Sequence, residues 1–178
     1  NNVDEISDVR LFDETVVLPH NWQMELGKGR DVPQYTNITY PFECNPPKIP
    51  QNNPCGVYNK DVTFTAEEIN CKDIYLLLEG VDSSAYIFIN GAFVAYRVTS
   101  HATSEINLTP HLKVGKNTIS VVVPKWCAQS YLEDQDKIRL SGIFRDVYLL
   151  KREKVCIKDV YVKYDLDSSA NVKVDLLV

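Results

Sequence analysis

Residues 85–96 read Ala85-Tyr86-Ile87-Phe88-Ile89-Asn90-Gly91-Ala92-Phe93-Val94-Ala95-Tyr96. Two apolar and aromatic runs, each of strand length, flank the dipeptide Asn90-Gly91. Asn-Gly between such runs is the strongest short-range signal for a β-hairpin, because a type I′ turn needs positive φ angles at both of its central residues. The sequence therefore predicts an antiparallel hairpin that turns at Asn90-Gly91.

Short apolar or alternating runs recur on both sides of this hairpin, and helical periodicity is nearly absent. We expect further strands over Thr15–Leu18, Val57–Phe64, Ile74–Leu78, Glu105–Leu108, Asn117–Val123 and Ile143–Leu150. Strands that follow one another every 8–12 residues, without intervening helices, are typical of a β-sandwich or jelly roll. The predicted fold class is an all-β jelly-roll sandwich.

A charged tetrad, Lys151-Arg152-Glu153-Lys154, marks a change of composition near the end of the chain. Beyond it, Val155–Tyr164 and Val172–Val178 alternate around a turn at Asp167-Ser168-Ser169, which is the pattern of another hairpin. We predict a first domain over residues 1–154 and, over 155–178, the opening strands of a second β-sandwich domain.

The segment from Pro33 to Cys55 contains six of the nine prolines of the chain. Proline fixes φ and cannot donate to a strand ladder, so this segment is predicted to be a stiff, extended surface loop. Because Tyr35, Tyr40 and Phe42 lie within it, we expect an ordered and functional loop.

Composition excludes several classes of protein. The 178 residues carry a formal net charge of −5, which is the wrong sign for a nucleic-acid-binding face. No apolar run approaches the length of a membrane-spanning helix. The five cysteines are widely spaced, and we expect reduced, mostly buried thiols rather than a disulfide framework or a zinc site.

Few residues suggest chemistry by themselves. In the acidic run Glu133-Asp134-Gln135-Asp136, the carboxylates of alternate residues lie on one face if the chain is extended. Such a pair suits glycoside hydrolysis or the binding of a cation. The same run is equally typical of a solvated acidic turn. Asn37 lies between aromatic residues and is suited either to a sugar hydroxyl or to a turn. The three histidines have no metal-ligand spacing, and no serine-hydrolase elbow, P-loop or dinucleotide motif occurs.

Asn37 and the acidic run belong to longer motifs that occur along the chain. They are Leu18-Pro19-His20-Asn21-Trp22-Gln23, Tyr35-Thr36-Asn37-Ile38-Thr39-Tyr40-Pro41, Asn45-Pro46-Pro47, Asn53-Pro54, Leu78-Glu79-Gly80-Val81-Asp82-Ser83, Asn90-Gly91, Gly115-Lys116-Asn117, Ser130-Tyr131-Leu132-Glu133-Asp134-Gln135-Asp136 and Ser141-Gly142-Ile143-Phe144-Arg145-Asp146-Val147. Together they resemble the N-terminal domain of the large bacterial β-galactosidases of glycoside hydrolase family 2, over about residues 10–178.

The resemblance implies a jelly-roll sugar-binding domain followed by the first strands of an immunoglobulin-like domain. It implies that the catalytic glutamates and the magnesium ligands lie in a barrel beyond Val178, so that no catalytic residue is expected in this chain. Asn37 matches an asparagine that contacts galactose. Asp136 matches an aspartate that binds near the galactose 6-hydroxyl and ligates a sodium ion.

We therefore expect a non-catalytic, substrate-positioning domain of a retaining β-galactosidase that hydrolyses terminal β-D-galactosyl residues. The expected partners are a lactose-like β-galactoside and the barrel of the same enzyme, without nucleic acid or membrane. Sodium is expected at Asp136 in the full enzyme, with no cofactor held tightly by this chain alone. The full enzyme is expected to be a cytoplasmic homo-oligomer.

Three alternatives remain at this point. The first is a self-contained glycosidase that uses Asp134 and Asp136. The second is a free-standing, lectin-like galactose-binding module. The third is the corresponding domain of a family 2 enzyme with another specificity.

Overall fold

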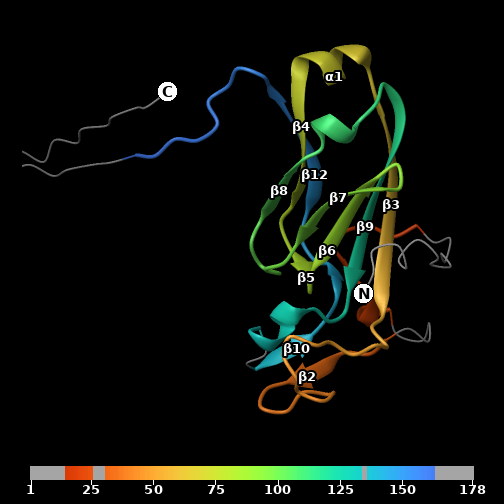
Figure 1. Cartoon of the computed structure of the whole chain (residues 1–178), viewed down its shortest axis with the longest axis vertical. Coiled ribbons are helices and arrows are strands. Elements are labelled where there is room, and N and C mark those ends of the chain that lie inside the picture. The colour runs from red at the N-terminus through yellow and green to blue at the C-terminus, as the bar shows by residue number, and fades with distance from the viewer. Residues whose placement is uncertain (1–14, 26–30, 134–135, 163–178) are drawn as a thin grey trace, which may run out of the picture.

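The computed structural model describes residues 15–25, 31–133 and 136–162 (Figure 1). The described chain is nearly all β, with antiparallel pairing throughout and one short α-helix. This confirms the predicted all-β sandwich. Among the described residues, no helix is long and apolar enough to cross a bilayer.

Two sheets form the body of the sandwich. The four-stranded sheet has the order β3-β9-β6-β7 and the three-stranded sheet the order β12-β4-β8. Their bounds are β3 Cys55–Phe64, β4 Lys72–Leu78, β6 Ala85–Ile89, β7 Ala92–Arg97, β8 Ser104–Asn107, β9 Gly115–Pro124 and β12 Val147–Glu153.

The core lies between these two sheets. Alternate residues of each strand point inward, so Ile87 and Val121 from one sheet share a buried cluster with Leu76 and Ile106 from the other. The long buried strand β9 pairs with both β3 and β6, and it therefore occupies the centre of its sheet. This core fixes the framework that carries the loops at its ends.

The hairpin prediction is confirmed. Strands β6 and β7 pair antiparallel across Asn90-Gly91. The φ angles are 52° at Asn90 and 83° at Gly91, which are the positive values that the turn requires.

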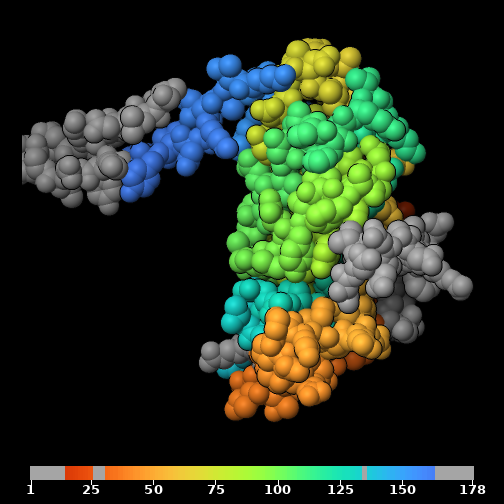
Figure 2. Space-filling model, in the orientation of Figure 1, coloured from red at the N-terminus to blue at the C-terminus, as the bar shows by residue number. Residues whose placement is uncertain are grey.

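Two small sheets complete the fold. β1 (His20–Asn21), β11 (Gly142–Ile143) and β5 (Val81–Asp82) pair in the order β1-β11-β5, and β2 (Gln34–Thr36) pairs with β10 (Lys137–Arg139). The 3-10 helices are η2 (Trp22–Met24), η3 (Thr109–His111) and η4 (Ala128–Tyr131). Figure 1 shows β2 and β10 at the end of the sandwich opposite α1, and Figure 2 shows residues of the proline-rich segment gathered at that end.

Several expectations need correction. The strand expected over Thr15–Leu18 is not formed, since pairing begins only at β1. The run Ile143–Leu150 is divided between β11 and β12, because the chain leaves one sheet and enters another. The strand expected over Val155–Tyr164 is absent from its described part, residues 155–162, and the rest of it lies outside the described residues. The predicted second domain therefore stays a prediction.

The cysteine prediction is correct about pairing and wrong about burial. All five thiols are free, but only Cys127 is buried and the other four are exposed. Four of the cysteines therefore contribute little to the core.

The helix α1 (Ala66–Cys71) was not expected from the sequence. Thr65 caps it, with its side chain accepting from the Glu68 backbone N–H while the Glu68 carboxylate accepts from the Thr65 N–H. The ammonium of Lys151 on β12 bonds the same carboxylate. The Lys151 contact, followed by the Thr65 N–H, lowers the pKa of Glu68 from 4.5 to about 2.

Glu68→Gln should therefore show a pH-dependent loss of stability. Because the folded-state pKa is depressed, the ionised carboxylate stabilises the fold fully above about pH 4.5, and this contribution is lost as the pH falls toward 2. Urea unfolding should show the largest difference from wild type near neutral pH and almost none near pH 2. Lys151→Met should reproduce this trend, since it removes the main cause. A difference that is constant with pH would contradict the assignment.

Candidate functional site

The two residues predicted to bind substrate lie side by side at one end of the sandwich. Strand β2 ends immediately before Asn37, and β10 begins immediately after Asp136. The antiparallel register pairs Thr36 with Lys137, so Asn37 and Asp136 lie opposite each other at the end of the two-stranded β2–β10 ribbon. Asp136 has a φ of 46°, a left-handed conformation that Asp tolerates better than most residues.

A tyrosine connects them. The Tyr35 hydroxyl donates to Asp136 Oδ1 at 2.6 Å and accepts from Asn37 Nδ2 at 3.3 Å. Residues i and i+2 of a strand share a face, so Tyr35 and Asn37 lie on the same side of the ribbon as Ile138 and Asp136. This exposed face of the β2–β10 ribbon carries a carboxylate, a phenol and an amide in one chain of hydrogen bonds.

The carboxylate also acts on the phenol. The hydrogen bond to Asp136 raises the pKa of Tyr35 above 10.0, and partial desolvation adds to the shift, while the Asn37 contact opposes it. The phenol is therefore protonated, and able to donate, throughout the neutral range.

The opposite face of the ribbon is buried and holds Arg139. Its guanidinium donates from Nε to Thr36 Oγ1 at 3.2 Å and from Nη2 to the carbonyl oxygens of Ser130 and Glu133, both at 2.7 Å. Arg139 also lies over the ring of Trp126, 5.5 Å from its centroid. One buried side chain thus ties β2, η4 and the turn before Asp136 together.

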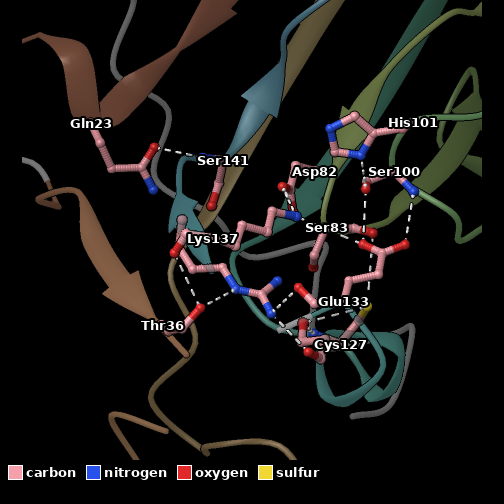
Figure 3. A network of polar contacts seen from close by, with 12 residues as sticks. Gln23, Thr36, Asp82, Ser83, Ser100, His101, Cys127, Glu133, Lys137 and Ser141 are labelled. Atoms are coloured by element: carbon pink, nitrogen blue, oxygen red, sulfur yellow. Dashed lines mark hydrogen bonds and ion pairs between the residues drawn. The ribbon is translucent and has the colours of Figure 1, made fainter. Parts of the chain in front are cut away.

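A second polar network holds both sides of the same turn (Figure 3). Lys137 extends to Asp82 on β5, with its Nζ 2.6 Å from Oδ2. Before the turn, the Glu133 carboxylate accepts from the Ser100 hydroxyl at 2.8 Å, and that hydroxyl also contacts His101 Nδ1 at 2.6 Å. The segment that carries Asp136 is therefore anchored at Glu133 and at Lys137.

The predicted proline-rich loop contains one strand that was not expected, β2, and the rest of it packs on the sandwich through aromatic side chains. Its Phe42 and Tyr40 pack on Trp126 and Tyr131, with ring centroids 4.9 and 5.1 Å apart. Asn53 Nδ2 donates to the Trp126 carbonyl oxygen at 2.8 Å, and the Trp126 N–H donates to Asn53 Oδ1 at 2.9 Å. The loop containing Asn37 and the segment leading to Asp136 therefore form one packed unit.

Of the other sequence candidates, Glu133 and His101 lie in the network beside the site, whereas His20 and His111 have other contacts. Asp134 lies outside the described residues. His20 contacts Tyr58 and Glu25, each at 3.4 Å, and His111 lies in η3, where the neighbouring Thr109 bonds Ile74 on β4. No group of three or more His, Cys, Asp or Glu side chains suitable for a metal ion occurs among the described residues.

Sequence reasoning missed Tyr35, Arg139 and Lys137. Tyr35 was noted only as an aromatic of the loop. The residues from Asp136 to Arg139 show no alternation of polar and apolar types that would mark β10, because Ile138 is exposed and Arg139 is buried. Nothing in that pattern indicates that the arginine, rather than Ile138, faces inward.

The fold and the site together define a β-sandwich binding module. Its oxygen-rich polar groups and aromatic side chains meet on loops at one end, which suits recognition of a polyhydroxylated ligand. Comparison with known proteins identifies the class. The family model for "Glycosyl hydrolases family 2, sugar binding domain" matches residues 6–153. The chain belongs to this family, and the resemblance drawn from the motifs is confirmed.

Relatives sharpen the assignment. The chain is 47% identical over 177 residues to a beta-galactosidase of Actinobacillus pleuropneumoniae, covering 98% of this chain and 17% of that protein. It is 44% identical over 156 residues to a beta-galactosidase of Vibrio vulnificus strain YJ016, covering 87% and 15%. The chain thus spans about a sixth of the length of these curated relatives.

Solved structures support the fold. A beta-glycosidase from Bacteroides vulgatus aligns with a TM-score of 0.59 at 23% identity, covering 90% of this chain and 20% of that one. A Bacteroides uniformis beta-glucuronidase aligns with a TM-score of 0.58 at 24% identity, covering 78% and 14%. At these identities the likeness concerns the fold alone.

Proposed function

We propose that this chain is the non-catalytic, substrate-positioning domain of a retaining β-galactosidase. The observation that carries the proposal is the convergence of Asn37 and Asp136, which come from distant parts of the sequence and share the Tyr35 hydroxyl. Both match galactose-contacting residues of the family that the chain resembles. They lie on the exposed face of a ribbon that Arg139 and Lys137 hold in place. This arrangement suits contact with a sugar that is bound mainly by another part of the enzyme.

Asp136 has the chemistry of a sodium ligand. Sodium is a hard cation that prefers oxygen ligands, and the exposed face supplies a charged carboxylate oxygen and the amide oxygen of Asn37. These two oxygens are only part of the coordination that a sodium ion needs, so the remaining ligands would come from elsewhere in the enzyme. When bound, the cation supplies positive charge that orients a sugar hydroxyl.

Orientation is the contribution this domain makes to catalysis. Correct placement of a bound substrate lowers the barrier substantially, and a misplacement of about 1 Å can cost on the order of 100-fold in rate. The network around Arg139 and Lys137 restricts the position of Asp136, which is what such a role requires.

The surface around the site supports contact with the rest of the enzyme. Large apolar side chains next to Asn37 and Asp136 are exposed, namely Tyr35 at 63%, Ile38 at 90% and Ile138 at 62%. Apolar groups gathered beside a polar site are typical of an interaction surface. Most of the length of the relatives lies outside this chain, so the barrel of the same polypeptide is the partner we propose.

Two rival functions make different demands. A self-contained retaining glycosidase with Asp134 and Asp136 as its pair needs two carboxyl groups about 5–5.5 Å apart. Asp134 lies outside the described residues, so the test of this rival is activity. Such an enzyme would turn over a nitrophenyl β-galactoside with this chain alone. A lectin-like module would bind galactose tightly without any further domain.

The proposal is tested with Asn37→Ala in the full-length enzyme. Loss of one neutral hydrogen bond to the sugar should lower kcat/KM about three- to tenfold. The free energy of unfolding should change by less than about 0.5 kcal/mol, because the residue is a loop position with few buried contacts. Steady-state kinetics and urea unfolding measure the two quantities.

Asn52→Ala is the matched control, since Asn52 is an exposed asparagine of the same loop. It should leave both quantities near wild type. If Asn37→Ala unfolds the domain instead, Asn37 is a structural residue and the proposed function loses its main support.

A further inference from the structure

We propose that Tyr35 is a positioning residue of the galactoside site, which sets the orientation of both Asp136 and Asn37 through its single hydroxyl. The inference rests on the proposed function and adds a residue to it. The contacts are the 2.6 Å hydrogen bond from Tyr35 to Asp136 Oδ1 and the 3.3 Å hydrogen bond from Asn37 Nδ2 to Tyr35.

The hydrogen bond from Tyr35 gives the two carboxylate oxygens of Asp136 different roles. A hydrogen bond to an ionised acceptor is shorter and stronger than one between neutral groups, and 2.6 Å lies in the short range. Oδ1 is held by the phenol, so Oδ2 is the oxygen that Tyr35 leaves for a cation or a sugar hydroxyl. Without the phenol, the carboxylate of an exposed aspartate can rotate among several orientations.

The same hydroxyl determines how the amide is placed. A phenol has one proton to donate, and Asp136 receives it. Asn37 therefore bonds Tyr35 through an N–H, which directs its Nδ2 toward the phenol and leaves the carbonyl oxygen to another donor. The carboxylate and the amide are in this way oriented relative to each other before substrate arrives.

Tyr35 itself is well held. It lies in β2, and its position in the ribbon is fixed by pairing with Ile138 on β10. Cross-strand neighbours of this kind pack against one another. The side chain is nevertheless 63% exposed, so its hydroxyl contributes little to the core. Removal of that oxygen should disturb orientation without disturbing folding.

The test is Tyr35→Phe in the full-length enzyme, compared with wild type and Asp136→Asn. Sodium activation is measured at constant ionic strength, and binding is measured separately as the sodium-dependent rise in melting temperature. We expect half-saturating sodium to rise about fivefold or more, as for loss of a bond to a charged group. KM should rise more than kcat falls, and the melting temperature without sodium should stay at the wild-type value.

Tyr40→Phe is the matched control. It removes the same atom from a neighbouring tyrosine, whose hydroxyl donates to the Tyr131 carbonyl at 2.8 Å. Its sodium response should remain close to wild type. In the Asp136→Asn background, Tyr35→Phe should add little, because the charged acceptor is already lost.

The outcomes separate the two proposals. If Asp136→Asn loses sodium response while Tyr35→Phe keeps it, the positioning role is wrong and the proposed function stands. If Tyr40→Phe loses as much response as Tyr35→Phe, the effect comes from loop packing and the positioning role is again wrong. If Asp136→Asn itself responds to sodium like wild type, the proposed function fails, and the role of Tyr35 fails with it.

Discussion

Asp136→Asn in the full-length enzyme should lower kcat/KM by at least about tenfold, which corresponds to about 1.4 kcal/mol of lost transition-state stabilisation. The amide keeps the size of the side chain and can still accept the Tyr35 hydroxyl, so the local structure should persist. What disappears is the negative charge that, under the proposed function, faces the cation and the sugar. Sodium activation should therefore weaken together with catalytic efficiency, and urea unfolding should give nearly the wild-type midpoint.

Asp61→Asn is the control for charge. Asp61 is an exposed aspartate on β3 that pairs with Lys116, and its substitution changes the net charge by the same amount without touching the β2–β10 ribbon. Kinetics in sodium and in potassium at constant ionic strength should distinguish the two variants. An unchanged sodium response in Asp136→Asn would remove Asp136 from the cation site.

The sandwich was predictable because its signals are local. Positive φ angles at Asn90 and Gly91, the period-two burial of β6 and the apolar end of β9 follow from residues near one another in sequence. The helix α1 was missed although Thr65 and Glu68 form the spacing of a capping box. A six-residue helix is too short to show the 3.6-residue periodicity by which helices are recognised in a sequence.

Pairing partners were harder to predict than strands. Residues 155–162 alternate as a strand would, but alternation shows only that a segment can be a strand, and a strand also needs a neighbour. The motifs illustrate the same limit. His20-Asn21, Gly142-Ile143 and Val81-Asp82 stand far apart in sequence, yet they pair as one small sheet.

The candidate site was predicted for a different reason, and its role in binding stays a prediction. Asn37 and Asp136 were identified by family resemblance, while their residue types alone left turns and solvated loops as alternatives. The structure adds their convergence on Tyr35. It also adds a buried arginine, which hydrophobic patterning assigns to the surface because charged residues are seldom buried without partners.

The buried arginine leads to the prediction with the largest effect on stability. Arg139→Met should lower the free energy of unfolding by about 2–4 kcal/mol, because it leaves the Ser130 and Glu133 carbonyl oxygens without their charged donor in a buried setting. This is a large share of the roughly 5–15 kcal/mol that stabilises a typical domain. Arg139→Lys should recover little, since one ammonium cannot reproduce the planar set of donors that reaches both carbonyls and Thr36.

Arg145→Met provides the comparison. Arg145 also donates to a backbone carbonyl, that of His101 at 3.0 Å, but this bond is exposed to water and its loss should cost less than about 1 kcal/mol. Urea unfolding gives the two free energies, and hydrogen exchange should show that Arg139→Met first exposes the amides of β2, η4 and β10. Because Arg139 bonds the Glu133 carbonyl close to Asp136, the proposed function implies that the same variant of the full-length enzyme should also lower galactosidase activity at temperatures where the domain is still folded. Equal stability of the two variants would mean that this buried arginine does not hold the β2–β10 ribbon in place.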